Sequence, residues 1–443
     1  MNTHKSFTVF VKQLSLLLFV VTCGCTDIST GNSDVITSDI DLFWAAYDKV
    51  VAEPDSLKQV GLMDSLYLQK GSPGLDAMVQ ARDYTAAEYV ALINRYPKYW
   101  KSIRPNTLKA KNLSKELQEG VDRLKQLYPE LKPAKIYFTV GAMRSGGTAV
   151  DSLALIGSEL AMADSNADIS EFEGRSKQWM EFILQTEPLE NLVLLNIHEY
   201  VHTQQNPISD KLLYRALYEG VAEYISVMAM GVHSTTPAIA YGKNNPKVKE
   251  KFEAEMFYER TYDWLWSNSP NEFEMRDLGY YIGYSIAEGY IKKSADSLKA
   301  IKTLIELDYT QESEANRIID ASGFFNKSIE SLKRGDEQKR PKVAKVEPFQ
   351  NSSRTVRPKT SKITFVFSEP LNGYHTGVDF GPAKKALFPK VLDRKWSEDH
   401  KKWTVLVELL PNTHYQMLLS SNFRTAQNTP LLPYLLDFKT TSE

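Results

Sequence analysis

Two histidines and a glutamate lie close together in the segment His198-Glu199-Tyr200-Val201-His202. On a helix, residues four positions apart lie one turn above each other, so both imidazoles could reach one metal ion. Glu199 lies beside the first histidine. It could point at an open coordination position and act as general base on a water there. This spacing predicts a zinc site that carries out hydrolysis.

A zinc site of this kind needs a third protein ligand. The histidine helix is expected to end near Pro207, and a second helix is expected from Lys211 to about Met230. Glu219 and Glu223 are four residues apart and share a face of that second helix. A short connection would fold the two helices back against each other, which would bring this face to the histidine pair.

The order HExxH, sixteen residues, then Glu219 resembles the gluzincin metallopeptidases, whose third ligand is a glutamate on a second helix. Tyr-Glu219-Gly-Val-Ala is similar to the Asn-Glu-Gly-Phe-Ala segment of the aminopeptidase branch. Glu219-x-x-x-Glu223 is similar to the Glu-x-x-x-Asp pair of thermolysin-like enzymes. The resemblance implies that His198, His202 and Glu219 bind zinc and that Glu223 orients His198 from behind. An exchange of roles between Glu219 and Glu223 stays open.

A helix rich in glycine and tyrosine is expected over residues 278–290. Tyr281, Tyr284 and Glu288 fall on one of its faces. Gluzincins often stabilise the oxyanion of the reaction with a tyrosine or a histidine. The resemblance therefore makes Tyr284 the candidate for this role, with Tyr281 as the runner-up. Aromatic packing between helices accounts for the same stretch equally well.

Residues 135–141 and 153–157 are expected to form strands upstream of the histidines, with Gly146 and Gly147 between them. Zincin peptidases place an edge strand above the metal, and an extended substrate pairs with it. The glycine pair is also typical of a plain hairpin turn. The chain has no Gly-x-Met-Glu-Asn motif, with which zinc aminopeptidases read a free N-terminus, so endopeptidase action is favoured.

The first 25 residues have the form of a secretory signal peptide, with an apolar run from Leu14 to Val21. Gly24-Cys25 resembles a relaxed bacterial lipobox, which makes Cys25 the lipidated first residue of the mature protein. Cys23 is the less favoured acceptor, and a plain cleaved signal is the alternative. We expect an exported bacterial lipoprotein anchored in the lipid bilayer of the outer membrane, on its periplasmic or cell-surface face. Both cysteines lie in this leader, so histidines and carboxylates must hold any zinc.

Composition and patterning divide the chain into several expected parts. With 443 residues and 42% apolar content, it can build more than one domain, and a formal net charge of -2 indicates no nucleic-acid partner. The fold class is expected to be α+β, with helices up to about residue 131 that break at Ser72-Pro and Arg104-Pro. The expected parts are a signal peptide (1–25), a flexible tether (26–38), a mostly helical zincin-like metallopeptidase domain with a small mixed sheet (39–335, its helical part 39–131 and its catalytic core 132–335), a linker (336–345) and an Ig-like β-sandwich (346–443).

Alternation of apolar and polar residues predicts strands beyond residue 345, around 363–367, 403–407 and 415–419. The segment from Leu410 to Tyr415 resembles a tyrosine corner, in which a hydroxyl ties a strand to the turn before it. These features resemble bacterial Ig-like surface modules, which space, dock or orient an enzyme.

The leading hypothesis is a membrane-anchored zinc metallopeptidase that acts on peptide or protein substrates. Glu199 would take a proton from the attacking water and return it to the leaving amine. One alternative is a surface binding or adhesion lipoprotein with a structural or inactive zinc site, and another is hydrolysis of the peptide stems of the cell wall. Glu199 argues against a structural site, because such a site does not need a carboxylate beside an open position.

Overall fold

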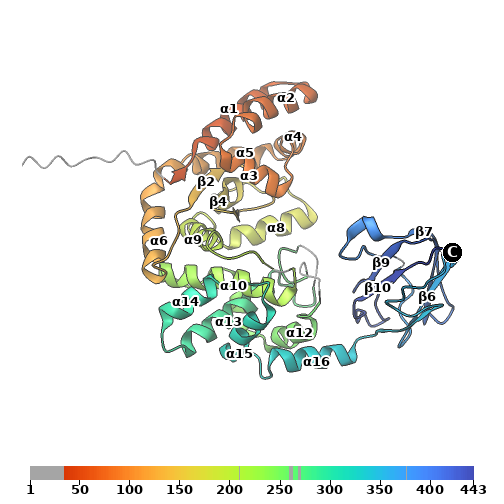
Figure 1. Ribbon diagram of the computed structural model, residues 1–443. Coiled ribbons are helices and arrows are strands. Elements are labelled where there is room, and N and C mark those ends of the chain that lie inside the picture. Colours follow the sequence, from red (N-terminus) through yellow and green to blue (C-terminus); the bar gives the residue numbers. More distant parts are fainter. Residues whose placement is uncertain (1–33, 209, 259–262, 268–270, 376) are drawn as a thin grey trace, which may run out of the picture. The chain divides into compact units, whose positions relative to one another are not determined.

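The structure is a computed structural model that describes residues 34–208, 210–258, 263–267, 271–375 and 377–443 (Figure 1). The predicted signal peptide, with Cys25, and most of the predicted tether lie outside the described residues. The fold is α+β, with mostly helices up to residue 339 and mostly strands beyond it. Two separate hydrophobic cores follow this division, one built from residues between Ile40 and Ile329 and the other from residues between Val346 and Phe438. Among the described helices, none combines the length and the hydropathy that a membrane span requires.

Helices open the described part of the chain. They are α1 (Ser38–Ala52), α2 (Ser56–Leu66), α3 (Pro73–Arg82), α4 (Ala86–Arg95), α5 (Pro97–Thr107) and α6 (Ser114–Leu127). The expected break at Ser72 is present, because the Ser72 hydroxyl caps α3. The expected break at Arg104-Pro is wrong, because α5 continues through Pro105 to Thr107. This proline lies in the last turn of the helix, and the buried Trp100 and Ile103 hold that helix in the core.

A small mixed sheet follows the helices of the N-terminal part. Its strands are β1 (Val35–Ile36), β2 (Lys135–Thr139), β3 (Gly147–Val150) and β4 (Leu153–Gly157), in the order β1-β2-β4-β3. Neighbouring strands are parallel except β3, which lies antiparallel to β4 at the edge of the sheet. The predicted tether is wrong at its end, because the apolar residues 35–36 pair with β2 as strand β1. Gly147 starts a strand and is more than a turn residue.

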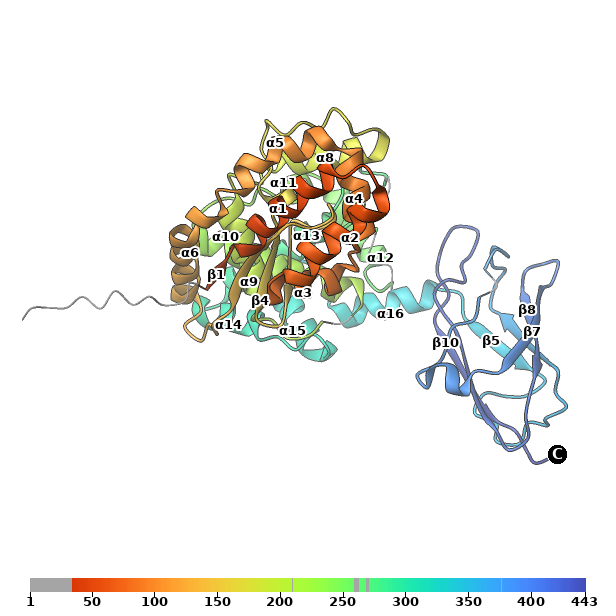
Figure 2. The ribbon, with the colours of Figure 1, turned by 90° about the horizontal axis from the view of Figure 1, so that it is seen from above.

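Helices also make up the rest of the larger core. They are α7 (Ser158–Ala161), α8 (Gly174–Gln185), α9 (Leu192–His202), α10 (Leu212–Met230), α11 (Pro237–Asn244), α12 (Pro246–Glu255), α13 (Leu278–Lys293), α14 (Ser297–Ile305), α15 (Glu312–Ser322) and α16 (Ile329–Lys339). The sheet lies between α1 and α3 above it and α9 below it in Figure 1, and β4 crosses α9 in Figure 2. The predicted helices 211–230 and 278–290 are confirmed as α10 and α13.

Two glycines let α10 and α13 approach each other closely. A Cβ added to Gly220 would lie 2.0 Å from the backbone carbon of Gly283, and one added to Gly283 would lie 1.7 Å from the Ala216 carbonyl oxygen. Neither position accepts a side chain without separating the helices. This contact fixes which turn of α13 lies opposite which turn of α10.

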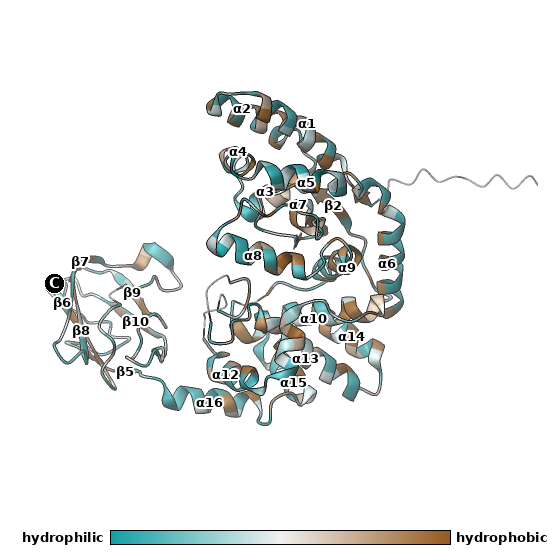
Figure 3. Cartoon of the chain, turned by 180° about the vertical axis from the view of Figure 1, so that it is seen from behind, coloured by the Kyte–Doolittle hydropathy of each residue, from teal (hydrophilic) through white to brown (hydrophobic). Residues whose placement is uncertain are grey.

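The predicted linker 336–345 is wrong at both ends. Helix α16 continues to Lys339, and strand β5 begins at Val343. Figure 3 shows that α16 is mostly hydrophilic, and Ile329 is its one buried residue among those described. A largely polar helix therefore occupies residues 336–339 of the predicted linker, and a strand occupies residues 343–345.

Strands of the C-terminal part form two antiparallel sheets. They are β5 (Val343–Glu347), β6 (Lys362–Phe367), β7 (Lys390–Trp396), β8 (Lys402–Glu408), β9 (His414–Leu419) and β10 (Tyr434–Lys439). The first sheet has the order β5-β6-β8-β7, and β9 pairs with β10. The predicted alternation is confirmed on β8, where Trp403, Val405 and Val407 are buried. The tyrosine corner is confirmed as well, because the Leu410 backbone N–H donates to the Tyr415 hydroxyl at 2.8 Å.

Glu159 is a fully buried carboxyl group in α7 that holds the loop after β2. It accepts hydrogen bonds from the backbone N–H groups of Gly141 at 2.7 Å and Met143 at 3.0 Å. Burial raises the pKa of Glu159 to about 7, although the two hydrogen bonds act in the opposite direction.

Stability is therefore expected to depend on the charge of Glu159. The unfolded chain ionises this group near pH 4.5, whereas the folded chain keeps its proton up to about pH 7. Protonated Glu159 contributes about 3 kcal/mol to the free energy of unfolding. This contribution is fully present below pH 4.5 and is lost as the pH rises through 7. Urea unfolding of the unsubstituted protein and of Glu159→Gln, between pH 4 and 8, measures this contribution of Glu159. We expect the stability difference between the two proteins to change across this window, and a constant difference would contradict the assignment.

Candidate metal centre

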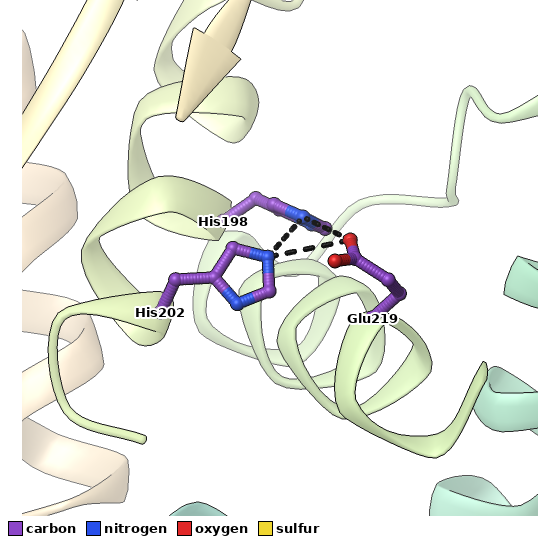
Figure 4. A group of neighbouring side chains, drawn as sticks. All are labelled: His198, His202 and Glu219. Carbon is purple, nitrogen blue, oxygen red and sulfur yellow. Dashed lines mark hydrogen bonds and ion pairs between the residues drawn. The ribbon is translucent and has the colours of Figure 1, made fainter. Parts of the chain in front are cut away.

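Three side chains from α9 and α10 point toward one another (Figure 4). His198 and His202 lie one turn apart near the end of α9, and Glu219 lies on α10. The Nε2 atoms of the two histidines are 3.0 Å apart, and Glu219 Oε2 lies 3.6 Å from His198 Nε2 and 3.4 Å from His202 Nε2. One ligand atom from each residue lies within 4.8 Å of the others.

The packing of α9 and α10 brings these residues together. The apolar face of α9 is buried through Leu192, Ile197 and Val201. This packing fixes the rotation of the helix and therefore the direction of its polar side chains. Helix α10 is buried along almost its whole length, including Glu219 and Glu223. Buried carboxylates at these positions are costly unless they are paired or bound to a cation.

The remaining nitrogen of each histidine has a partner of its own. His198 Nδ1 lies 3.1 Å from Glu223 Oε2, and His202 Nδ1 lies 2.6 Å from Gln205 Oε1. The Gln205 amide nitrogen donates to the Tyr218 carbonyl and the Tyr309 hydroxyl, which turns its oxygen toward His202. Both Nδ1 atoms therefore act as donors, and both Nε2 atoms present lone pairs to the space between them.

This donor set fits a divalent cation. When both histidines are neutral, two lone pairs and a carboxylate oxygen face one another in a buried site, as the ligands of a cation do. Metal–ligand bonds of about 2.0–2.2 Å in tetrahedral zinc sites place neighbouring ligand atoms about 3.3 Å apart. The separations of 3.0, 3.4 and 3.6 Å agree with that value. His198, His202 and Glu219 could thus hold one ion.

Without a metal, a proton takes the place of the cation. Burial opposes a charge on His198, but hydrogen bonds to Glu219 and Glu223 outweigh it and raise the pKa of His198 to about 10. Burial likewise opposes a charge on Glu219, yet the two histidines hold its pKa well below the ordinary value. The pKa of Glu223 is also lowered against the effect of burial, by His198 and by the hydroxyls of Ser234 and Thr236.

Glu199 lies on the side of the centre that faces the sheet. A Cβ added to Gly147 would lie 2.5 Å from Glu199 Oε1, so the carboxylate lies directly against edge strand β3. Burial raises the pKa of Glu199, while the charges of His198 and His202 act in the opposite direction. The structure thus brings a carboxylate of raised pKa, an edge strand and three ligand atoms to one place.

The three neighbouring tyrosines of α13 lie in different surroundings. The ring of Tyr284 packs edge-on against Tyr224 with centroids 4.9 Å apart, and the ammonium of Lys243 lies 4.6 Å from its centroid. Tyr281 packs against Phe324. Sequence reasoning selected these two residues, and the structure brings neither ring against the histidines.

Tyr280 is the tyrosine of α13 that reaches the centre, and sequence reasoning missed it. Its ring centroid lies 6.1 Å from that of His198. Burial, and then the charges of Glu219 and Asp277, raise the pKa of Tyr280 well above its ordinary value, so the hydroxyl keeps its proton. Tyr280 lies four residues before Tyr284, on nearly the same helix face. The sequence pattern contained this tyrosine, but nothing in it indicated which turn faces the two histidines.

Two further residues complete the walls of the centre. The ring of Tyr218 stacks on His202, with centroids 4.6 Å apart and an interplanar angle of 13°. Gln205 Oε1 contacts Nδ1 at the edge of the same ring. Tyr218 directly precedes Glu219 and Gln205 lies three residues after His202, but no motif distinguishes either residue in the sequence.

Comparison with known proteins gives no family for this chain. No protein-family model matches it, and no curated protein matches it. Among solved structures, the S-layer protein rSbsC(31-844) matches with 12% sequence identity and a TM-score of 0.18, over 92% of this chain and 45% of that chain. The N-terminal part of the bacterial S-layer protein SbsC matches with 12% identity and a TM-score of 0.17, over 91% of this chain and 77% of that chain. TM-scores this low carry no argument about fold or function.

Proposed function

We propose that this protein is a zinc-dependent metallopeptidase of gluzincin type that hydrolyses peptide bonds within extended chains. His198, His202 and Glu219 hold the ion, and Glu223 and Gln205 orient the two histidines. The observation that carries the proposal is the convergence of two histidine nitrogens and a carboxylate oxygen, with a further carboxylate, Glu199, near enough to feel the charges of both histidines.

Zinc and Glu199 have different roles in the proposed hydrolysis. Zinc, when bound, supplies a Lewis acid that polarises the substrate carbonyl and makes a neighbouring water more acidic. Glu199 takes the proton of the attacking water and hands it to the leaving amine, and its raised pKa suits both steps. The buried surroundings of Glu199 also restrict the access of other water to this carboxylate.

Tyr280 takes the role for which Tyr284 was the sequence candidate. Its hydroxyl is protonated and lies beside Glu219, so it can donate a hydrogen bond as negative charge develops on the carbonyl oxygen. Strand β3 ends the sheet next to Glu199, so an extended peptide can pair with its free edge. Substrate, base and hydroxyl then meet at one side of the ligand triad.

The remaining parts of the proposal concern the setting of the enzyme. Cys25 carries a lipid anchor, and the protein is an exported lipoprotein of the outer membrane. The two C-terminal sheets, with the core between Val346 and Phe438, form an Ig-like β-sandwich that spaces the peptidase from its surroundings. The Leu410–Tyr415 corner and the separate core support this domain assignment.

Metal analysis combined with peptide digestion tests the proposed function. We expect about one zinc per chain by elemental analysis, and new peptide termini by mass spectrometry after incubation with a mixed peptide library. A chelator should abolish cleavage and added zinc should restore it. Cleavage inside the peptides supports an endopeptidase, whereas stepwise shortening from one end contradicts that part of the proposal. A zinc-loaded protein that leaves every peptide intact overturns the function.

A further inference from the structure

Trp266 is a half-exposed aromatic residue beside the candidate metal centre. Its indole Nε1 donates a hydrogen bond to the Tyr280 hydroxyl at 3.3 Å, while the residue is 49% exposed. The guanidinium carbon of Arg215 lies 5.9 Å from the ring centroid. The polar edge of this indole thus meets the hydroxyl that lies next to Glu219.

The segment that carries Trp266 is fixed to the first turn of α13. The Trp264 carbonyl accepts a hydrogen bond from the Gly279 N–H at 2.9 Å. Leu265 is fully buried, and a Cβ added to Gly279 would lie 2.7 Å from its Cδ2 atom. The Trp266 N–H donates to Asp277 Oδ1 at 2.6 Å. Trp264, Leu265 and Trp266 thus contact Gly279 or Asp277, at the N-terminal end of the helix that carries Tyr280.

The hydrogen bond from Trp266 restricts where Tyr280 can direct its own proton. A phenol hydroxyl has one proton and can also accept, whereas an indole N–H can only donate. Because Trp266 occupies the accepting side of the Tyr280 oxygen, the hydroxyl proton must point elsewhere. The charge of Glu219 raises the pKa of Tyr280, so this carboxylate lies near enough to attract the proton.

We infer that Trp266 is a positioning residue, which fixes the rotation of the Tyr280 hydroxyl so that its proton points to the Glu219 side of the metal centre. That is the side at which a substrate carbonyl oxygen becomes negative, so the catalytic meaning of this inference rests on the proposed function. The hydrogen bond itself does not depend on that function. Trp266 acts through Tyr280 and takes no part in proton transfer.

A double-mutant cycle tests this coupling. Trp266→Phe keeps an aromatic ring and removes the indole N–H, and it should lower kcat about threefold to tenfold with KM changed by less than about twofold. Tyr280→Phe should lower kcat about 100-fold. In the Tyr280→Phe background, adding Trp266→Phe should change kcat by less than about twofold, because the hydroxyl is already absent.

Trp396→Phe is the matched control. It removes an indole N–H that donates to the His375 carbonyl at 3.1 Å in the C-terminal part. We expect kcat to stay unchanged. Equal losses from Trp266→Phe in both backgrounds would show that Trp266 acts without Tyr280, and no loss in either background would show that it does not act at all. Both results overturn the inference.

Indole N–H signals give a readout that does not need activity. The chain has seven tryptophans, and the spectrum of Trp266→Phe identifies the signal of Trp266 by its absence. In metal-free and in zinc-loaded protein, Tyr280→Phe should shift that signal and leave that of Trp396 in place. An unmoved Trp266 signal overturns the inference. If the unsubstituted protein cleaves no peptide, the proposed function is overturned, while these spectra still decide whether Trp266 holds Tyr280.

Discussion

Glu199→Gln is expected to keep zinc and to lose peptide hydrolysis, with kcat lower by about 100- to 10,000-fold. Glutamine has nearly the same shape as glutamate, so it fits beside Gly147, where the Glu199 carboxylate lies against β3. It cannot accept and return a proton, however. The substitution should therefore lower the rate of proton transfer while the three metal ligands stay in place. Elemental analysis and the rate of peptide cleavage, measured on the same preparation, separate the two effects.

Glu181→Gln is a suitable control for this substitution. Glu181 lies on α8 at the surface, where its carboxylate is 3.9 Å from Lys177, and exposed pairs of this kind contribute little. This variant should cleave peptides at the unsubstituted rate. A Glu199→Gln protein that also cleaves at the unsubstituted rate would rule out Glu199 as the general base.

The second large effect is expected on zinc affinity, in a comparison of Glu219→Gln with Glu223→Gln. Glu219 Oε2 faces both histidine Nε2 atoms, whereas Glu223 Oε2 faces only His198 Nδ1. Glu223→Gln removes the partner that orients His198 and is expected to weaken zinc binding about 10- to 100-fold. Glu219→Gln removes a metal ligand and should weaken it further. Competition with a chromophoric chelator measures both affinities.

The order of the two affinities decides which glutamate binds the ion. Glu219→Gln should bind zinc more weakly than Glu223→Gln at every pH. The reverse order would exchange the roles of the two residues, which the four-residue spacing alone leaves open. Circular dichroism of both variants shows whether a change in affinity comes from a change in fold.

Much of the candidate site could be predicted from the sequence because helix geometry is local. The spacing of His198 and His202 fixes a common face on any helix, and the same holds for Glu219 and Glu223. The position of Pro207 and the apolar pattern of the following segment predicted α10 almost to the residue. The tyrosine corner at Leu410–Tyr415 is local as well, since both partners lie within six residues.

The parts that could not be predicted depend on contacts between distant segments. Tyr280 reaches the centre because Gly220 and Gly283 set the register between α10 and α13, and no pattern within α13 contains that register. Trp266 belongs to a segment without helical or strand period. The pairing of residues 35–36 with β2 joins segments about a hundred residues apart in sequence. In α5, packing of Trp100 and Ile103 outweighs the local effect of Pro105.

Diffraction at the zinc absorption edge tests the central claim most directly. In crystals of the zinc-loaded protein, we expect a single strong anomalous peak about 2.0–2.2 Å from His198 Nε2, His202 Nε2 and one carboxylate oxygen of Glu219. Glu199 should lie outside bonding distance of that peak, beside the open coordination position. A peak bound elsewhere, or one that lacks any of these three ligands, would contradict the assignment of His198, His202 and Glu219 as the metal ligands.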